Sequence, residues 1–186
     1  MNDRFYIENT PLDGLCILQR KPVGDSRGYL ERLFCSEDLL VHTQGKKIVQ
    51  INHTFTKDRG TVRGLHFQSP PHAEIKFVSC LRGQVFDVAV DMRDNSPTFL
   101  HWFALMLSAD NFKTLLIPEG FAHGFQTQSD ECEMLYFHTK AYHSGAECGV
   151  HALDPKLAIP WPLPVVGLSS RDSAHSFLSN DFTGVT

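Results

Sequence analysis

Short apolar segments separated by turn-forming residues recur along most of the chain. The segments are rich in Val, Leu and aromatic residues, and they end at Gly, Pro, Asp or Asn. Apolar runs of this length with such boundaries are typical of β-strands. Strands are therefore predicted at residues 14–22, 29–34, 47–54, 61–68, 75–81, 84–92, 100–107, 113–117, 123–128 and 132–138. This spacing is typical of a β-barrel or a β-sandwich.

Two segments break this pattern. Residues 36–45 are predicted to form a short helix. From about residue 143 the chain becomes irregular, with the Pro-rich run DPKLAIPWPLP followed by SSRDSAHSFL. Proline interrupts helices and sheets, and this stretch is too short for a second core. We therefore predict a single domain over residues 1–186, with the C-terminal extension packed over the barrel.

Composition supports this interpretation and narrows the function. The 14 Phe and 10 Pro favour many short strands and an all-β fold. A formal net charge of −4 leaves no basic surface for nucleic acid. No apolar run approaches the ~18 residues of a membrane span, and the first residues lack a secretion signal, so we predict a cytoplasmic protein without a membrane partner. The five cysteines form no C-x-x-C pair and are predicted to be reduced thiols.

Glycine and histidine recur at characteristic spacings in two segments. The first segment contains Gly60, His66, Gln68, Glu74 and Gly83. The second is P-x-G-x-x-H, at residues 118–123. Together they resemble the paired motifs of the cupins, whose fold is a double-stranded β-helix, or jelly-roll barrel. The resemblance implies that the predicted strands close into such a barrel.

In the first motif a glutamine stands where metal-dependent cupins have a histidine. An amide oxygen is a poor ligand for a transition metal compared with imidazole, so a site in which Gln68 replaces histidine would be weak. We therefore predict no metal, and we keep a metal-dependent cupin enzyme that uses His66, Glu74 and His123 as an alternative. The histidines expected to be ordinary core or surface residues are His53, His72, His101, His138, His143, His151 and His175.

Several ionisable residues within apolar segments could act together with His66. Histidine takes up a proton near neutral pH and suits general-base chemistry. Lys76 lies between apolar neighbours, so it either faces outward or pairs with an anion. Asp87 and Asp91 lie on one face of a predicted strand by the period-two rule. Tyr136 is either a core aromatic with a hydrogen-bonded hydroxyl or a catalytic acid.

Longer stretches of the chain also form a recognisable set. They are DSRG at 25–28, QINH at 50–53, VRGLHFQ at 62–68, DVAVDMR at 87–93, IPEGFAHGF at 117–125 and LSSRD at 168–172. From about residue 11 to residue 178 the chain resembles the dTDP-4-dehydrorhamnose 3,5-epimerase family. The resemblance implies a homodimer of jelly rolls that epimerises a nucleoside-diphosphate-linked 4-keto-6-deoxy sugar at carbons 3 and 5, without metal or other cofactor. The implied partner is a nucleotide sugar.

The resemblance also implies roles for particular residues. His66 is the implied base, held by Asp172, and Tyr136 is the implied acid on the opposite side of the sugar. Lys76 is implied to lie beside the sugar carbonyl, where it stabilises the enolate that proton removal creates. The residues implied to bind the substrate are Arg63, Arg27, Gln50, Asn52, His123, Tyr142, Arg171 and Asp87.

Some positions depart from the family pattern. Val23 stands where an aromatic residue is common and Arg32 where glutamate is common, and in the family both positions contribute to recognition of the nucleoside base. Phe137 replaces a common lysine, and Ser79 replaces a common arginine. The alternatives are therefore an epimerase that acts at carbon 3 alone on a sugar linked to another nucleotide, a metal-dependent cupin enzyme, and a sugar-binding cupin without catalytic activity.

Overall fold

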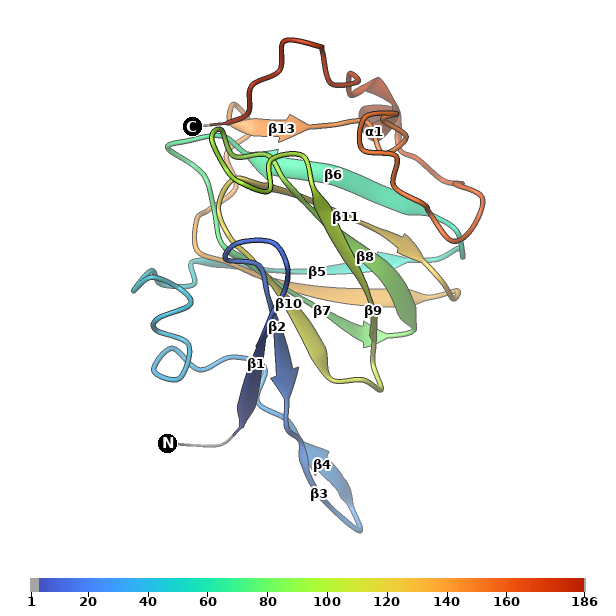
Figure 1. Ribbon diagram of the computed structural model, residues 1–186. Helices are drawn as coiled ribbons and strands as arrows, with labels where there is room; N and C mark the ends of the chain where they lie inside the picture. Colours follow the sequence, from blue (N-terminus) through green and yellow to red (C-terminus); the bar gives the residue numbers. More distant parts are fainter. Residues whose placement is uncertain (1–3, 186) are drawn as a thin grey trace.

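Two antiparallel sheets face each other in the computed structural model, which describes residues 4–185 (Figure 1). The six-stranded sheet has the order β1 (Phe5–Asn9), β2 (Cys16–Arg20), β10 (Lys113–Ile117), β7 (Lys76–Arg82), β12 (Cys132–His138) and β5 (Gln50–Thr56). The five-stranded sheet has the order β13 (Glu147–Gly149), β6 (Val62–Gln68), β11 (Phe121–Thr127), β8 (Gln84–Asp91) and β9 (Trp102–Ser108). A separate hairpin consists of β3 (Val23–Asp25) and β4 (Gly28–Leu30). The all-β prediction is confirmed.

The main core lies between the two sheets. Side chains of a strand alternate between its two faces, so each strand supplies every second residue to this layer. Val78 of β7 and Leu115 of β10 meet Ala89 of β8 and Phe125 of β11 there, and all four are buried. Burial of apolar surface between the sheets is therefore the main term that holds the barrel closed.

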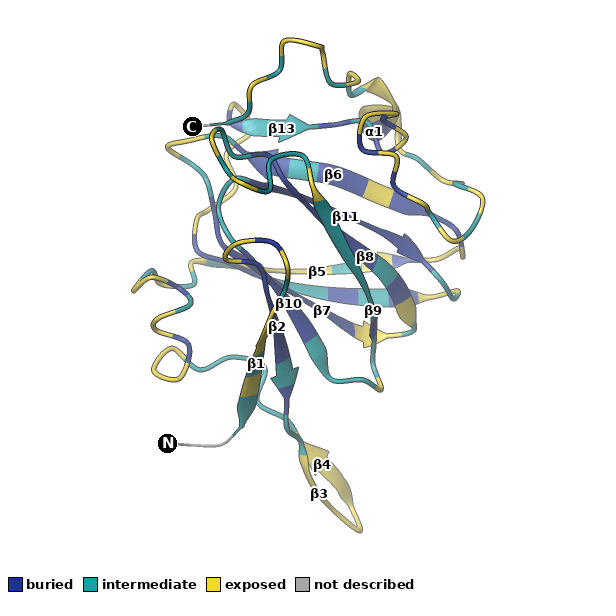
Figure 2. Cartoon of the chain, in the orientation of Figure 1, coloured by how far each residue is buried: buried dark blue, intermediate teal, exposed yellow. Residues whose placement is uncertain are grey.

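The outer faces of both sheets are covered by the irregular parts of the chain. Val150, Leu157 and Ile159 of the C-terminal extension pack with Leu65 and Val90 on the outer face of the five-stranded sheet. On the other side, the segment between β4 and β5 packs over the six-stranded sheet. Figure 2 shows the resulting pattern, with buried strands inside and exposed residues on the loops and the hairpin. The prediction that the extension packs over the barrel is confirmed.

The predicted helix at residues 36–45 is wrong. The segment forms successive turns, in which the N–H of Leu39 bonds to the carbonyl of Cys35 and the N–H of Thr43 bonds to that of Leu39. The chain then reverses through Gln44 and Gly45, whose φ angles of 53° and 73° cannot continue a right-handed helix. Isolated turns that are packed on a sheet are enough to order this segment.

Short elements at both ends of the chain were not predicted. Strand β1 pairs with β2, and the three-residue β13 pairs with the edge of β6. The helix α1 (Ser170–Ala174) begins at Ser169, whose side chain accepts a hydrogen bond from the backbone N–H of Asp172. Serine at this cap position is favoured because it satisfies a free N–H of the first helical turn. Elements this short depend on neighbours that local sequence does not reveal.

Strands β6 and β11 approach each other closely at two glycines. A Cβ atom on Gly64 would lie 2.5 Å from the Cα of Gly124, and one on Gly124 would lie 2.7 Å from the carbonyl oxygen of Arg63. The register shifts at this point, and His66 lies directly opposite His123. The pair of glycines therefore allows the two strands to present both motif histidines at one place.

Replacing Gly124 with alanine is expected to destabilise the fold. The new methyl group would also lie 2.9 Å from the side chain of Leu65, and crowding of this kind costs about 1–3 kcal/mol in free energy of unfolding. Urea unfolding measures the change. Gly145→Ala is the control, because its methyl group would meet only the flexible side chain of His143. Equal stabilities of the two variants would contradict the expectation.

Candidate active site

A cavity of about 580 Å³ lies between the sheets, at the end covered by α1. Its walls come from β5, β7 and β12 on one side and from β6 and β11 on the other, and residues 167–172 close it. Two residues of the predicted site, Arg27 and Asp87, do not line it. The predicted site residues that line the cavity are His66, Asp172, Tyr136, Lys76, Arg63, Gln50, Asn52, His123, Tyr142 and Arg171.

His66 and Asp172 form a hydrogen-bonded pair in the cavity wall. The Nε2 atom of His66 lies 2.7 Å from Oδ1 of Asp172. The Asp172 side chain is 3% exposed, whereas that of His66 is 23% exposed and lines the cavity. Because Nε2 is engaged by the carboxylate, Nδ1 is the nitrogen that remains to accept a proton. This is the arrangement of a base whose tautomer and orientation are set by a carboxylate.

The structure keeps Asp172 ionised. Burial acts to raise its pKa, but the hydrogen bond and charge of His66, the N–H of Gly64 and the hydroxyl of Ser169 outweigh burial and hold the pKa below its ordinary value. These partners come from β6 and from the cap of α1. The helix cap therefore places the carboxylate and also supports its charge.

The lowered pKa of Asp172 predicts a specific loss of stability in acid. Unfolded aspartate has a pKa of about 3.9, so the stabilising effect is complete above that pH and is lost as the pH falls through the lower folded value. Between about pH 6 and pH 3, the free energy of unfolding should fall further in the native protein than in Asp172→Asn. Urea unfolding at both pH values tests this, with the exposed Asp110→Asn as control. Equal acid sensitivity of native protein and Asp172→Asn would refute it.

Lys76 points into the barrel and pairs with an anion. Its side chain is 9% exposed, and Nζ lies 3.1 Å from Oε1 of Glu74 and 3.1 Å from the carbonyl oxygen of His66. The alternative that Lys76 faces outward is therefore wrong. Burial acts to raise the pKa of Glu74, but contacts with His138 and the charge of Lys76 outweigh it and lower that pKa. The cavity thus holds a fixed ammonium group with an ionised partner.

Tyr136 lies on the opposite sheet from His66. Its ring packs against the main core and against the ring of His123, with 6.0 Å between ring centroids, and it lines the cavity. Burial, with a further contribution from the Asp87 carboxylate, raises the pKa of Tyr136 above its ordinary value. The phenol therefore keeps its proton at neutral pH and is suited to donate it.

Asp87 lies behind the cavity wall and holds His123. Both carboxylate oxygens lie 3.0–3.1 Å from Nε2 of His123, and the Asp87 side chain is fully buried. Burial raises the pKa of Asp87, against the opposing effect of His123. Asp87 thus positions His123 and has no surface in the cavity. Asp91, on the same face, binds Arg93, Ser96 and Thr98 instead.

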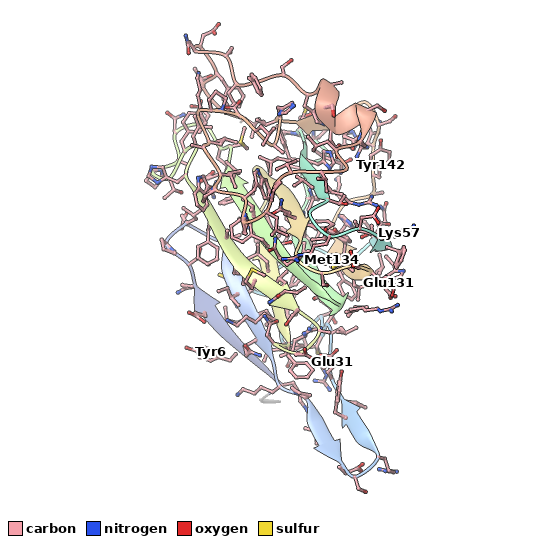
Figure 3. The ribbon with its side chains drawn as sticks, turned by 90° about the vertical axis from the view of Figure 1, so that its right-hand side faces the viewer. Tyr6, Glu31, Lys57, Glu131, Met134 and Tyr142 are labelled. Carbon is pink, nitrogen blue, oxygen red and sulfur yellow. The ribbon has the colours of Figure 1, made fainter. Side chains whose placement is uncertain are left out.

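Polar and charged residues surround the mouth of the cavity. Arg171 contacts Glu147 at 2.9 Å, and the hydroxyl of Tyr142 donates to the same carboxylate. Gln50 accepts a hydrogen bond from the backbone N–H of Tyr142. In Figure 3, Tyr142 lies toward the end of the molecule that carries α1. On the other side of the mouth, Arg63 donates to the hydroxyl of Thr56.

Arg27 lies away from the residues that line the cavity of its own chain. It lies at the tip of the β3–β4 hairpin, which projects from the body (Figures 1 and 3), and pairs with Asp25 at 2.6 Å. Its side chain is 88% exposed. A single chain therefore does not bring Arg27 into the cavity. Val23, at a position where the chain departs from the family pattern, is exposed on the same hairpin.

Three residues near the site were missed by sequence reasoning. His138, expected to be an ordinary core or surface residue, lines the cavity and contacts Glu74 at 3.6 Å; its place two residues after Tyr136 was the available signal. His175 contacts the ring of His66. Glu147 lies on the short β13, within the stretch read as irregular, and no local pattern marked it.

The residues of the metal-dependent cupin motif do not fit a metal site here. Gln68 donates to Glu74 at 2.6 Å and accepts from the backbone N–H of His143, so its amide is committed to structure. Glu74 neutralises Lys76, and His123 is bound to Asp87. Each of these side chains is turned to a partner in the protein, so the set does not fit a metal ion.

Comparisons with known proteins agree with this geometry. The model of the dTDP-4-dehydrorhamnose 3,5-epimerase family matches residues 9–180. The chain belongs to this family. An enzyme of that name from Shigella flexneri is 40% identical over 176 residues, covering 93% of this chain and 96% of the relative. A dTDP-4-dehydrorhamnose 3-epimerase from Streptomyces niveus is 45% identical over 114 residues, covering 61% of this chain and 55% of that enzyme.

A solved epimerase structure shows that the fold is shared across nearly the whole chain. The dTDP-6-deoxy-D-glucose-3,5-epimerase of Legionella pneumophila Philadelphia 1, in complex with dTDP-4-keto-L-rhamnose, superposes with a TM-score of 0.90 at 38% identity and covers 98% of each chain. The predicted epimerase family, the cupin-type jelly roll and the isomerase class are thereby confirmed. Within residues 4–185, no helix has the length and apolar character needed to cross a membrane.

Proposed function

We propose that this epimerase-family chain, acting as a single domain, inverts carbons 3 and 5 of a dTDP-linked 4-keto-6-deoxyhexose. The family match supports the reaction, and one feature of the cavity supports the mechanism. His66 on β6 and Tyr136 on β12 come from opposite sheets and line the same cavity. A sugar between them would be flanked by a base on one face and an acid on the other, which is the requirement for inversion.

The first step is removal of a proton by His66. The carbonyl at carbon 4 acidifies the hydrogens at carbons 3 and 5, and Nδ1 of His66 takes one of them. The electron pair of the C–H bond moves to the carbonyl oxygen and forms an enolate, while the imidazolium is stabilised by Asp172 at 2.7 Å. His66 and Asp172 thus act as the base and the residue that orients it.

Lys76 is positioned to stabilise the enolate. Its ammonium group is buried in the cavity wall, where electrostatic interactions are stronger than in water. Glu74 holds this group in place at 3.1 Å, so little reorganisation accompanies formation of the oxyanion. Tyr136 then returns a proton to the opposite face of the carbon, and the enolate collapses to the ketone with inverted configuration.

The remaining predicted residues are assigned to substrate binding. Arg63 and Arg171 bring positive charge to the mouth of the cavity and suit the diphosphate. Gln50, Asn52 and Tyr142 offer hydrogen bonds at the rim, and His123 does so deeper in the cavity, held by Asp87. For Arg27 we assign a contact with the nucleotide in the partner cavity of a dimer, because its own cavity is out of reach.

A homodimer in the cytoplasm is part of this proposal. Val23, Tyr29 and Leu30 are each more than half exposed on the projecting hairpin, and Ile51 and Phe55 are about half exposed along the edge strand β5. Apolar surfaces of this kind favour association with a second copy. Light scattering after gel filtration should therefore give twice the mass of the 21.0 kDa chain. A monomer at micromolar concentration would remove this part of the proposal.

Deuterium incorporation tests the reaction itself. In heavy water, the enzyme should introduce deuterium at both carbon 3 and carbon 5 of dTDP-4-keto-6-deoxyglucose, observed by NMR. Exchange at carbon 3 alone would assign the single-centre activity that the Streptomyces niveus relative is named for. Exchange only when the sugar is linked to a different nucleoside diphosphate would change the assigned nucleobase of the substrate. No exchange with any nucleotide sugar would overturn the proposed function.

A further inference from the structure

A third ionisable side chain stands beside the His66–Asp172 pair. The ring of His175 contacts the ring of His66 edge to face, with 5.5 Å between centroids. His175 directly follows α1, so it lies one turn beyond Asp172. The imidazole nitrogens and carboxylate oxygen that these three residues could offer to a metal ion lie within 4.8 Å of one another. Among residues 4–185, this is the only such group of three His, Cys, Asp or Glu side chains.

The position of His175 is set by the strand next to His66. Gly149 of β13 pairs with His66 of β6, and a Cβ atom on Gly149 would lie 2.3 Å from Nε2 of His175. The imidazole thus occupies the space that a side chain at position 149 would fill. Its Nε2 is buried and has no hydrogen-bond partner. A buried nitrogen without a partner is costly, and a bound ligand would supply the missing interaction.

We propose that His66, Asp172 and His175 form a binding site for a divalent transition-metal ion such as Zn²⁺, and that binding of the ion inhibits the enzyme. Two imidazoles and one carboxylate are a common ligand set for zinc, with a water molecule in the fourth position. The ion would bind His66 and Asp172 together, so His66 could no longer act as the base. Inhibition rests on the proposed role of His66, whereas binding of the ion does not.

The geometry requires a small movement. With bonds of about 2.1 Å, the ligand atoms of a tetrahedral zinc site lie roughly 3.4 Å apart. The ligand atoms here lie within 4.8 Å of one another, so the most distant pair must approach by at most about 1.4 Å. His66 and Asp172 are already closer than a tetrahedral site requires, at 2.7 Å. The adjustment therefore falls mainly on His175, which is half-buried at the end of a five-residue helix in the C-terminal extension.

The charges around the triad permit a cation. Arg171 opposes it, because its guanidinium lies 3.6 Å from Asp172 and 3.4 Å from Nε2 of His66. Arg171 is 56% exposed, however, and also pairs with Glu147 at 2.9 Å, so it can stay on Glu147 when the ion binds. The two carboxylates of Glu147 and Asp172 then outweigh the one positive charge of Arg171, so the surroundings of the triad carry a net negative charge.

Metal binding is measured on the full chain after dialysis against a chelator. Co²⁺ is the spectroscopic probe, because tetrahedral coordination by nitrogen and oxygen gives visible absorption bands, and Zn²⁺ is then used in competition. The expected result is one ion per chain. His175→Gln should weaken binding at least ~10-fold, since loss of even an outer hydrogen-bond partner of a metal ligand commonly costs that much. Thermal melting confirms that the variant is folded.

Two control variants separate this site from binding elsewhere. His101 is exposed and directly precedes β9, which lies at the other end of the five-stranded sheet from β6 and β13. His101→Gln should therefore leave the affinity for Co²⁺ unchanged. His72→Gln breaks the stacked pair of His72 and His143, whose rings lie 4.0 Å apart and offer a second surface for metal. If Co²⁺ binding survives in His175→Gln and is lost in His72→Gln, the proposed site is wrong.

Enzyme assays complete the test. Zn²⁺ should inhibit turnover of the native enzyme at the concentration at which it binds, a chelator should restore activity, and His175→Gln should need at least ~10-fold more Zn²⁺ for the same inhibition. Metal binding without inhibition would show that the ion does not reach the base and would overturn the proposal. A protein that lacks epimerase activity would refute the proposed function, while the Co²⁺ spectra would still decide whether the triad binds metal.

Discussion

Replacing His66 with asparagine is expected to lower kcat by about 10⁴-fold, the upper end of what general acid–base catalysis supplies. Both carbon centres depend on this base, and the amide of asparagine cannot accept a proton at neutral pH. The shorter amide of asparagine does not reach Asp172 as Nε2 of the native imidazole does, but the buried carboxylate keeps the N–H of Gly64 and the hydroxyl of Ser169 as partners. Affinity for dTDP should therefore change little.

NMR of the substrate in heavy water and calorimetric titration with dTDP measure the two effects separately. His101→Asn is the matched control, since His101 is exposed and outside the cavity. Deuterium incorporation by His66→Asn at the native rate would end the proposed mechanism. Loss of both turnover and dTDP binding would instead show that His66 supports the architecture of the cavity.

Replacing Tyr136 with phenylalanine is expected to separate proton exchange from inversion. His66 can still remove a proton and return it to the same face, but the face toward β12 lacks its donor. Formation of inverted product should fall by about 10²- to 10³-fold, within the range of general-acid contributions, while solvent deuterium still enters the sugar. The raised pKa of Tyr136 means that the native residue is protonated, so the loss should be the same across the neutral range.

The ratio of deuterium incorporation to product formation, followed by NMR, reports this separation directly. Tyr6→Phe serves as control, because Tyr6 is exposed on β1 and lies outside the cavity. If Tyr136→Phe formed inverted product as fast as the native enzyme, the acid would have to be another group. Equal loss of exchange and inversion would place Tyr136 in substrate binding instead.

The cavity also shows how a cupin barrel can be adapted to acid–base chemistry. Glu74 occupies a position that binds metal in metal-dependent cupins, and here it is the counterion of Lys76. Gln68, which stands in place of a histidine, donates to the same carboxylate and so fixes its orientation. The substitution that weakens a metal site therefore also supports the ammonium group that is proposed to stabilise the enolate.

Two sequence interpretations were settled only by the tertiary structure. From the sequence, Lys76 could face either outward or inward. In the structure it points inward, because its ammonium group pairs with Glu74 and donates a hydrogen bond to the carbonyl of His66. The DSRG motif implied that Arg27 binds the substrate, but the hairpin that carries Arg27 projects away from the cavity of its own chain.

By itself, the sequence determined the all-β class, the two histidine motifs, the strands that carry them and the family. The strands and the motifs depend on local alternation and on spacing along one segment, which a single chain displays directly, whereas the family followed from the resemblance of longer stretches. The resemblance implied that Asp172 holds His66, and the tertiary structure places the two 2.7 Å apart across 106 positions. Only the tertiary structure decided that β13 and α1 form and that His175 lies beside the pair. Such contacts arise when the C-terminal extension folds back onto the five-stranded sheet, and short elements held by those contacts leave no periodic pattern of their own.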